Sequence, residues 1–341
     1  MRQVVITRYG KPEVLQLREA VDPTPGDGEI RIAVRASGVN FADVMARLGL
    51  YPDAPKPPMV VGYEVAGVVD AVGAGGAGVT DYRVGDRVLA MTRFGGYADR
   101  VVVPALFAFP VPDGINDAAA AAIPVNYLTA YLALYRIANL LEGETVLVHG
   151  AGGGVGIAAT QLARLRGAKV IGTASSAKHE AIRQLGVQHA IDYRDGNLIA
   201  NVRHITGKRG VDVILDPIGG KSFSDSYRLL APLGRLIVYG VSSLASGEQR
   251  NWLHALVTML RMPKFGPLSL MNQNRGVFGL NLGHLWREHA QLADAMRAIL
   301  REVAAGRLQP IVARTFPLEH AADAHRFMQS RSNIGKVVLT T

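Results

Sequence analysis

The sequence predicts an α/β protein that combines a β-rich N-terminal domain with a doubly wound parallel sheet, and three observations support this prediction. The chain has 341 residues, which suggests about two domains at roughly 100–200 residues each. Hydrophobic residues make up 49% of it and charged residues only 19%, so it is too apolar to be disordered. The 38 glycines and 17 prolines indicate many tight turns rather than a helical bundle.

The chain up to about Pro112 consists of short alternating or β-branched runs separated by Gly and Pro turns. The runs are Gln3–Ile6, Glu29–Ala36, Val65–Val72, Asp86–Ala90 and Asp99–Val103. This pattern predicts β-strands. A turn at Pro110–Gly114 follows them, after which Asn116 or Asp117 can cap an alanine-rich helix. We expect the first domain boundary near this turn.

From Thr145 onward, apolar runs alternate with helical stretches. The apolar runs are Val146–His149, Val170–Ala174, Ala190–Tyr193, Val211–Asp216, Arg235–Tyr239 and Val277–Leu280. Repeated β–α units of this kind predict a parallel, doubly wound sheet. The rhythm ends after a long helix expected over His289–Ala305, and we assign the strands expected over Pro310–Phe316 and Lys336–Leu339 to the first domain. The predicted domains are therefore 1–121 completed by 304–341, and 122–303.

Cysteine is absent from the chain, and the formal net charge is +9. Without cysteine, the chain forms no disulfide, thiolate-bound zinc site, iron–sulfur cluster or cysteine nucleophile. The positive charge favours anionic ligands, but Lys and Arg are scattered with no basic block between aromatic residues, so we do not expect nucleic-acid binding. Residues 1–8 alternate like a strand and lack the apolar core of a signal peptide, so we expect a cytoplasmic protein.

Two uncharged stretches are long enough to span a membrane, Ala118–Tyr135 and Val146–Ala163. The first is mostly weakly apolar alanine and contains Pro124, Asn126 and Thr129, while the second is interrupted by glycines. We therefore interpret both stretches as buried core of the protein.

A glycine-rich loop, G-A-G-G-G-V-G over residues 150–156, directly follows the expected strand Val146–His149 and opens an apolar helix, Ile157–Leu165. Glycine permits a tight turn and a close approach of the backbone to a pyrophosphate, whose charge then lies at a helix N-terminus. The spacing G-x-x-G-x-x-G differs from the commoner G-x-G-x-x-G, but the strand–turn–helix context makes the motif specific. The residues expected to bind a dinucleotide pyrophosphate are Gly150, Gly153, Gly154, Val155 and Gly156.

The residues after the second expected strand indicate which dinucleotide binds. An NAD site places Asp or Glu about twenty residues after the first glycine, where it binds the ribose 2′-hydroxyl. This chain has Ser175 and Lys178 there, and Glu180 comes one helical turn too late. A hydroxyl and an ammonium suit a 2′-phosphate, because Lys178 can form a charge-assisted hydrogen bond. We therefore predict NADPH as the cofactor.

Short motifs are spread over nearly the whole chain. They are Gly38–Asp43, Gly49–Pro52, Gly62–Gly67, Gly85–Val88, the glycine loop, Val125–Tyr131, Ala174–Glu180, Asp216–Gly220 and Gly335–Leu339. Their order and spacing resemble the medium-chain dehydrogenase/reductase superfamily, in particular its quinone oxidoreductase branch and the VAT-1 group within it. The resemblance implies a GroES-like domain closed by the C-terminus, a Rossmann domain, NADPH in the cleft and usually a homodimer.

The same resemblance implies the site residues. In quinone reductases, residues at the positions of Asn40, Asp43 and Tyr51 line the nicotinamide cleft. The Asn40 amide is a donor for a developing enolate oxygen, whereas Tyr51 either supplies a proton or forms only a wall. Zinc-dependent members hold zinc through Cys and through the His of a G-H-E motif, where this chain has Tyr63, so we expect no metal. The resemblance also implies cofactor contacts at Asn126 and Thr129 near the nicotinamide, Tyr193 near the 2′-phosphate, and Gly240 and Val241 after the fifth strand.

Two functions are consistent with these residues. The leading hypothesis is an NADPH-dependent, zinc-independent reductase that transfers hydride to a quinone or an α,β-unsaturated carbonyl. The alternative is a VAT-1-like nucleotide-binding protein that acts at membranes or on partner proteins. The basic, apolar segment 242–275 is either a lid over the substrate or such a surface, and we do not favour membrane contact. We expect a homodimer, because the short strand Val277–Leu280 can pair across a two-fold axis.

Overall fold

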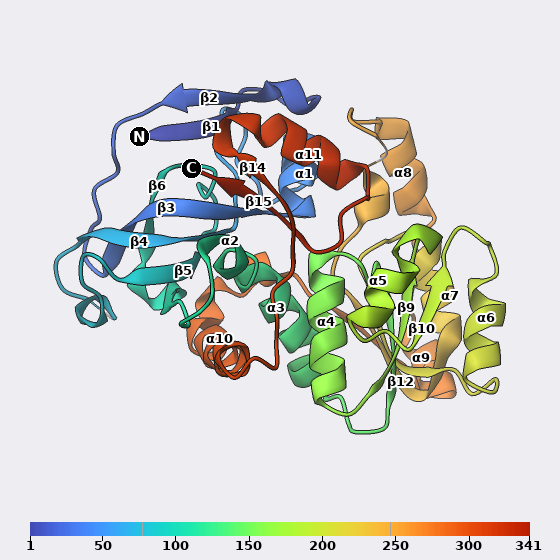
Figure 1. The fold of residues 1–341 in the computed structure, drawn as a ribbon. Helices are drawn as coiled ribbons and strands as arrows, with labels where there is room; N and C mark the ends of the chain where they lie inside the picture. The colour runs from blue at the N-terminus through green and yellow to red at the C-terminus, as the bar shows by residue number, and fades with distance from the viewer. Residues whose placement is uncertain (77, 246) are drawn as a thin grey trace. The chain divides into compact units, whose positions relative to one another are not determined.

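The computed structural model describes residues 1–76, 78–245 and 247–341, which form two compact units (Figure 1). The first unit comprises Met1–Leu128, Gly247–Arg250 and Gly283–Thr341, and the second comprises Thr129–Ser246 and Asn251–Leu282. The helix α10 (His289–Ala304) belongs to the first compact unit, whereas the sequence predicts that the second domain extends to residue 303. The domain limits themselves stay a prediction.

The first unit is built on a seven-stranded, mainly antiparallel sheet. Its strands follow the order β14-β15-β3-β4-β5-β7, and β6 also pairs with β3. The strands are β3 (Glu29–Val39), β4 (Glu64–Val72), β5 (Arg87–Met91), β6 (Arg100–Pro104), β7 (Ala108–Pro110), β14 (Val312–Pro317) and β15 (Lys336–Thr340). The C-terminal strand β15 runs antiparallel to β3, with Val337 opposite Val39. Segments almost 300 residues apart in the sequence are thereby joined in one sheet.

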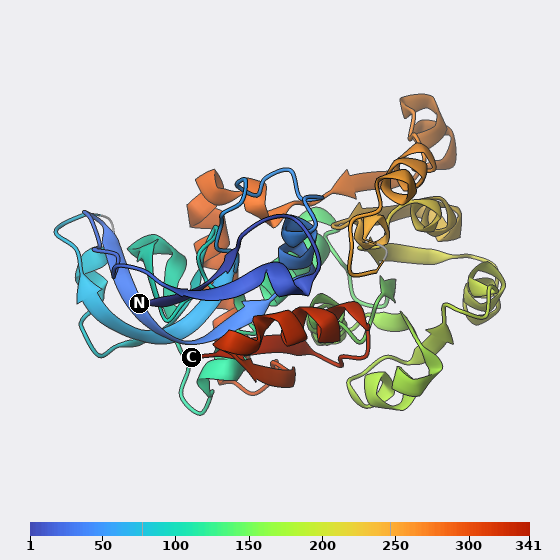
Figure 2. The ribbon, with the colours of Figure 1, turned by 90° about the horizontal axis from the view of Figure 1, so that it is seen from above.

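A two-stranded hairpin and several helices complete the first unit. The hairpin consists of β1 (Arg2–Ile6) and β2 (Leu15–Glu19). The helices, besides α10, are α1 (Phe41–Arg47), α2 (Asp117–Ala120) and α11 (Ala321–Gln329). Figure 2 shows α11 beside the N-terminal hairpin, where it contacts the turn η1 (Pro12–Val14). Buried apolar residues from both ends of the chain, including Ile6 and Leu339, form the core between these elements.

The second unit is a six-stranded parallel sheet in the order β10-β9-β8-β11-β12-β13 (Figure 1). The strands are β8 (Thr145–His149), β9 (Lys169–Ala174), β10 (His189–Asp192), β11 (Val211–Asp216), β12 (Leu230–Val238) and β13 (Gly276–Gly279). Every neighbouring pair is parallel. This is the doubly wound order 3-2-1-4-5-6, which confirms the predicted fold class and puts the topological switch between β8 and β11.

Helices connect the parallel strands of the second unit. They are α4 (Gly154–Leu165), α5 (His179–Gln184), α6 (Leu198–Ile205), α7 (Lys221–Leu229), α8 (Trp252–Leu260) and α9 (Pro267–Gln273). Every residue of the central strand β11 is buried, because helices cover both faces of a parallel sheet. The segment that we expected to be a lid or a surface forms α8 and α9, which connect β12 to β13.

The alanine-rich stretch after the first domain is helical, as predicted. Asn116 caps α2, since its Oδ1 accepts a hydrogen bond from the Ala119 backbone N–H at 2.8 Å. The helical segment Asp117–Ile137 also contains α3 (Pro124–Tyr131) and the π-helical turn η4 (Leu132–Ile137). It is the one helical segment among the described residues that is long and apolar enough to cross a membrane, but 72% of its apolar window is buried within the protein. This burial is that of a core helix.

Candidate functional site

The glycine loop joins β8 to α4 at the carboxyl edge of the parallel sheet. Gly150 has a φ of +65°, a left-handed conformation that other L residues rarely adopt. A Cβ on Gly156 would lie 2.3 Å from the carbonyl oxygen of Gly150, so only glycine fits at position 156. Gly153 is the N-cap of α4, whose first backbone N–H groups have no partner within the helix. The loop therefore forms a cradle for a pyrophosphate at a helix N-terminus.

A buried polar network adjoins the first residue of this loop. The imidazole of His149 contacts Thr173 Oγ1 through Nδ1 at 3.1 Å and Ser226 Oγ through Nε2 at 3.0 Å. Ser226 Oγ donates to Asp216 Oδ2 at 2.8 Å, and the Gly150 backbone N–H donates to Thr173 Oγ1 at 3.3 Å. Burial lowers the pKa of His149, so its imidazole is neutral at pH 7. The network ties the ends of β8, β9 and β11 together.

One cationic side chain lies beside the loop, and a second one acts on it electrostatically. The side chain of Lys178 lies against the loop, since a Cβ built on Gly152 would be 3.2 Å from Lys178 Cδ. Burial, followed by the positive charge of Arg194, lowers the pKa of Lys178. The Arg194 guanidinium lies 5.6 Å from the centre of the Tyr193 ring. Arg194, which was not predicted as a site residue, thus contacts the predicted residue Tyr193 and influences the predicted residue Lys178 through its charge.

The carboxylate at the end of β10 fixes the backbone around this cationic group. Asp192 accepts hydrogen bonds from the backbone N–H of Ser176 at 2.8 Å and of Arg194 at 2.9 Å. Ser175, which precedes Ser176, is half-buried. Arg194 directly follows Tyr193 after the predicted third strand. This position could have identified it as a cofactor-binding residue from the sequence.

Of the remaining predicted cofactor residues, Asn126 lies in the first unit, where its Oδ1 accepts from Lys336 Nζ at 3.5 Å, whereas Thr129, Gly240 and Val241 lie in the second unit. Thr129 is a buried residue of α3. Gly240 and Val241 follow β12, and the neighbouring Ser242 N–H donates to the Pro217 carbonyl at 2.9 Å, which ties the ends of β11 and β12 together. Their roles, like those of all the site residues, stay predictions.

The first unit contains a buried charged cluster around Asn40. Lys336 Nζ donates to Asn40 Oδ1 at 2.6 Å and forms an ion pair with Glu64 Oε1. Asn40 Nδ2 donates to the same Glu64 oxygen at 3.0 Å and to the Gly38 carbonyl at 3.4 Å. The other oxygen of Glu64 accepts from the Val125 backbone N–H at 2.7 Å. Both Asn40 donor contacts therefore end on protein oxygens, so binding a substrate oxygen requires Asn40 to exchange one of them.

A second buried chain of hydrogen bonds ends on Asp43. Arg47 Nε donates to His325 Nδ1 at 3.3 Å, which leaves the imidazole proton on Nε2, 3.1 Å from the Tyr97 hydroxyl. That hydroxyl donates to Asp43 Oδ2 at 3.1 Å. Asp43 also accepts hydrogen bonds from the backbone N–H groups of Asn40 at 2.7 Å and of Gly62 at 3.0 Å. The predicted residues Asn40 and Asp43 are thus brought together.

Three buried charged residues of these two clusters, Glu64, Lys336 and Arg47, were not predicted as site residues from the sequence. A charged residue directly before a run of apolar strand residues was the available signal for Glu64 and Lys336. Arg47 is fully buried at the end of α1. Tyr51, the third predicted residue, lies with its ring edge-on to that of Tyr63, with ring centres 6.0 Å apart.

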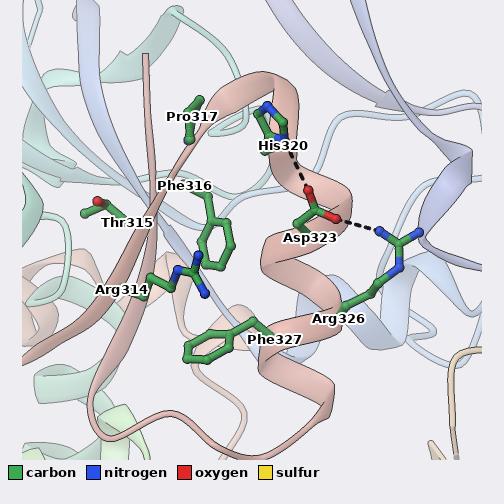
Figure 3. A pocket seen from close by; sticks show the side chains of 8 residues that line it. All are labelled: Arg314, Thr315, Phe316, Pro317, His320, Asp323, Arg326 and Phe327. Carbon is green, nitrogen blue, oxygen red and sulfur yellow. Dashed lines mark hydrogen bonds and ion pairs between the residues drawn. The ribbon is translucent and has the colours of Figure 1, made fainter.

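A surface hollow of about 390 Å³ lies between β14 and α11 of the first unit (Figure 3). The guanidinium of Arg314 stacks over Phe316, 4.7 Å from the ring centre. Asp323 accepts hydrogen bonds from Arg326 at 2.7 Å and contacts His320 at 3.1 Å, so these polar groups satisfy one another. No predicted site residue lines this hollow, and it is not the candidate site.

The described residues contain no group of three or more His, Cys, Asp or Glu side chains that could hold a metal ion. Tyr63 stands where zinc-dependent members of the superfamily have a zinc-binding His, and its ring packs against Tyr51 and Phe94. Aromatic rings and a phenol hydroxyl do not form a zinc site with nitrogen and sulfur ligands.

Comparisons with known proteins agree with this architecture. Residues 26–113 match the family described as alcohol dehydrogenase GroES-like domain, and residues 185–339 match the family described as zinc-binding dehydrogenase. The synaptic vesicle membrane protein VAT-1 homolog of Danio rerio is 43% identical over 100% of this chain and 70% of its own length.

Two solved structures extend the comparison. Escherichia coli quinone oxidoreductase complexed with NADPH is 30% identical, with a TM-score of 0.88 and full coverage of both chains. The CurK enoyl reductase is 26% identical, with a TM-score of 0.86 over 99% of this chain and 98% of its own. Structural relatives thus bind NADPH. With its GroES-like sheet, doubly wound sheet and glycine loop, the chain belongs to the medium-chain dehydrogenase/reductase superfamily, among the VAT-1 homologues and quinone oxidoreductases.

Proposed function

We propose that this protein is an NADPH-dependent, metal-independent reductase that transfers hydride to a quinone or an α,β-unsaturated carbonyl. The observation that carries the proposal is the glycine cradle at the end of β8 with Lys178 against it. A Cβ at position 156 would clash with the loop backbone at Gly150 and Ala151, so this tight turn requires glycine, as expected of a loop that binds a dinucleotide pyrophosphate. When bound there, NADPH supplies the hydride from its nicotinamide ring.

The choice of NADPH over NADH rests on the cations of the second unit. Lys178 and Arg194 influence each other electrostatically, and Tyr193 stacks with Arg194. We assign these residues and Ser175 to the 2′-phosphate, because a dianionic group suits two cations and a hydroxyl. The Asp192 carboxylate is already bonded to two backbone N–H groups, which supports a structural role for it.

The residues of the first unit suit acceptor binding without a metal. The chain contains no cysteine, and Tyr63 replaces the expected zinc-binding His. Carbonyl polarisation then depends on hydrogen-bond donors. Lys336 and Glu64 hold the Asn40 amide between them, and Asp43 holds the Asn40 backbone. This arrangement keeps one wall of the acceptor site rigid while water supplies the final proton.

A panel of quinones and enones, with NADPH or NADH and protein treated with EDTA, tests the proposal. We expect NADPH oxidation with at least one acceptor class, slower oxidation of NADH, and no effect of the chelator. Loss of activity with EDTA, or no reduction of any acceptor, would contradict the reductase.

The exposed apolar residues of α8 and α9 favour an association of this protein with itself. Trp252, Leu253, Leu260 and Leu268 are all more than 60% exposed. The adjoining strand β13 forms an edge of the sheet and carries the exposed Phe278. Because an open strand edge next to an apolar face suits isologous pairing, we propose a homodimer formed through β13 and these helices.

Sedimentation velocity at micromolar concentration tests the dimer. We expect a dimer mass for the wild type and a monomer mass for Phe278→Glu. If the wild type is monomeric and instead binds anionic phosphatidylserine vesicles in a salt-sensitive way that requires Arg261 and Lys264, the VAT-1-like membrane function replaces this proposal.

A further inference from the structure

The hydroxyl of Tyr63 is buried and has no hydrogen-bond partner among the described residues. Its neighbours in the polar cluster are all bonded: Tyr97, for comparison, donates its hydroxyl to Asp43 at 3.1 Å. Buried hydroxyl groups in native proteins almost always have partners, so an exception calls for an explanation. Since the hydroxyl is a donor that the folded chain leaves unused, a ligand that brings an acceptor oxygen would satisfy it.

The backbone around Tyr63 is held tightly, which fixes the position of its ring. The Gly62 backbone N–H donates to Asp43 Oδ1 at 3.0 Å, and the Thr92 backbone N–H donates to the Tyr63 carbonyl at 2.8 Å. A Cβ at Gly62, which has a φ of +105°, would lie 2.7 Å from atoms of Tyr97. These backbone contacts therefore restrict the direction of the Tyr63 side chain.

The surroundings of the ring suit a flat, apolar ligand with a carbonyl group. The Tyr63 ring lies edge-on to Tyr51 at 6.0 Å and tilted to Phe94 at 5.4 Å. Aromatic walls of this kind pack well against a quinone or an aryl enone. The Tyr63 ring lies against Tyr51, and the backbone N–H of Gly62, directly before it, is bonded to Asp43, so Tyr63 adjoins two of the three residues predicted to line the acceptor site.

Tyr63 keeps its proton at neutral pH. Burial raises the pKa of its hydroxyl well above the usual value of 10.0, and the nearby Asp43 carboxylate, Tyr51 and Asp53 raise it further. The group is therefore a neutral hydrogen-bond donor and a poor acid.

We propose that the Tyr63 hydroxyl binds the carbonyl oxygen of the acceptor and stabilises the negative charge that develops on it. This inference rests on the proposed reductase function. For an enone, hydride adds to the β-carbon and the double-bond electron pair shifts through the α-carbon to the oxygen, which gives an enolate. The enolate accepts the Tyr63 hydrogen bond, and a proton from water completes the saturated ketone. One hydride and one proton are consumed, and Tyr63 ends as it began.

The variant Tyr63→Phe tests this role because it removes the hydroxyl and keeps the ring. We expect kcat/KM for quinones or enones to fall about 10–100-fold, since a single oxyanion donor has effects of about this size. The Kd for NADPH should not change. The melting temperature of the ligand-free protein should stay the same or rise, because an unsatisfied buried hydroxyl is removed.

Tyr82→Phe is the matched control, since the Tyr82 hydroxyl donates to the Ala108 carbonyl at 2.5 Å. Its removal should lower the melting temperature and leave kcat/KM unchanged. If the Tyr63 hydroxyl has only a structural role, Tyr63→Phe should likewise lower the melting temperature and leave kcat/KM unchanged, which would overturn the proposal. Unchanged kcat/KM together with an unchanged melting temperature would also overturn it.

A binding measurement separates this proposal from the reductase function. The probe is 1-tetralone, a ketone without a reducible carbon–carbon double bond, titrated in the presence of NADP⁺. Tyr63→Phe should weaken its binding about tenfold, and Tyr82→Phe should not. If the wild type reduces no acceptor, the reductase fails while this titration still decides the Tyr63 assignment. Equal affinity in wild type and Tyr63→Phe overturns it.

Discussion

The polar residues around the predicted acceptor site of the first unit are bonded to one another inside the protein, whereas the predicted nucleotide-binding residues of the second unit lie around the glycine loop. Lys336, Glu64 and Asn40 are each at most 8% exposed and satisfy one another. In the second unit, Lys178 is half-buried and Tyr193 is exposed. One region is organised by pairs formed on folding, and the other is suited to receive an anion. Changes in the first should therefore reduce stability, and changes in the second should reduce nucleotide affinity.

Replacing Lys336 breaks the first region most severely. Lys336→Met leaves Glu64 as a buried charge without its cation, which should lower the free energy of unfolding by about 3–5 kcal/mol. Urea denaturation measures this loss. The double variant Lys336→Met/Glu64→Gln should recover part of it, because no buried charge is left unpaired. A single variant as stable as the wild type would show that the pair does not support the fold.

The pH dependence of stability provides a second test of the buried region. Burial raises the pKa of Asp43 from 3.8 to about 7, against hydrogen bonds that lower it. Between these values the folded state binds more protons than the unfolded chain, so stability falls as the pH rises through this window. The loss from this group is at most about 4 kcal/mol. Asp43→Asn should remove this part of the dependence in denaturation at about pH 5 and about pH 8, and identical slopes would refute the assignment.

Gly156→Ala tests the nucleotide loop. Its methyl group would lie 2.3 Å from the Gly150 carbonyl oxygen, so the loop must move to accommodate it. We expect NADPH to bind on the order of 100-fold more weakly, which corresponds to roughly 3 kcal/mol. Gly266→Ala is the control, because no atom lies within 4 Å of a Cβ at that glycine. Fluorescence titration should find NADPH affinity unchanged in the control, and equal affinities in both variants would contradict the cradle.

Lys178→Ala has the smallest expected effect and the most specific one. It should weaken NADPH binding by about 1–3 kcal/mol, the range for a charged hydrogen bond, while NADH affinity stays the same. Lys264→Ala, an exposed lysine outside the loop, should change neither affinity. If the wild type binds both dinucleotides equally, the assignment of the 2′-phosphate to this position is wrong.

Much of the fold could be predicted from the sequence because its strands are short apolar runs with clear turns. The glycine loop was identified for the same local reason. Two strands were missed: β2 has only one buried residue, Leu15, and β7 spans just Ala108–Pro110. Neither shows an alternating pattern long enough to detect.

The buried pairs could not be predicted in the same way. Lys336 and Glu64 meet because β15 and β4 both flank β3, an arrangement that depends on strand pairing across most of the chain. The relay from Arg47 through His325 similarly joins α1 to α11. Sequence spacing carries no signal for such contacts, whereas motifs that bind through consecutive backbone groups, such as residues 150–156, are visible directly.

Hydride transfer itself is the most direct test of the central claim. Wild-type protein treated with EDTA is incubated with an enone and with NADPH deuterated at either the 4R or the 4S position of the nicotinamide. The account predicts that one of the two labelled forms places a single deuterium on the β-carbon of the product, as detected by mass spectrometry and NMR. A reduced product that carries no deuterium from either form, or no reduced product at all, would contradict it.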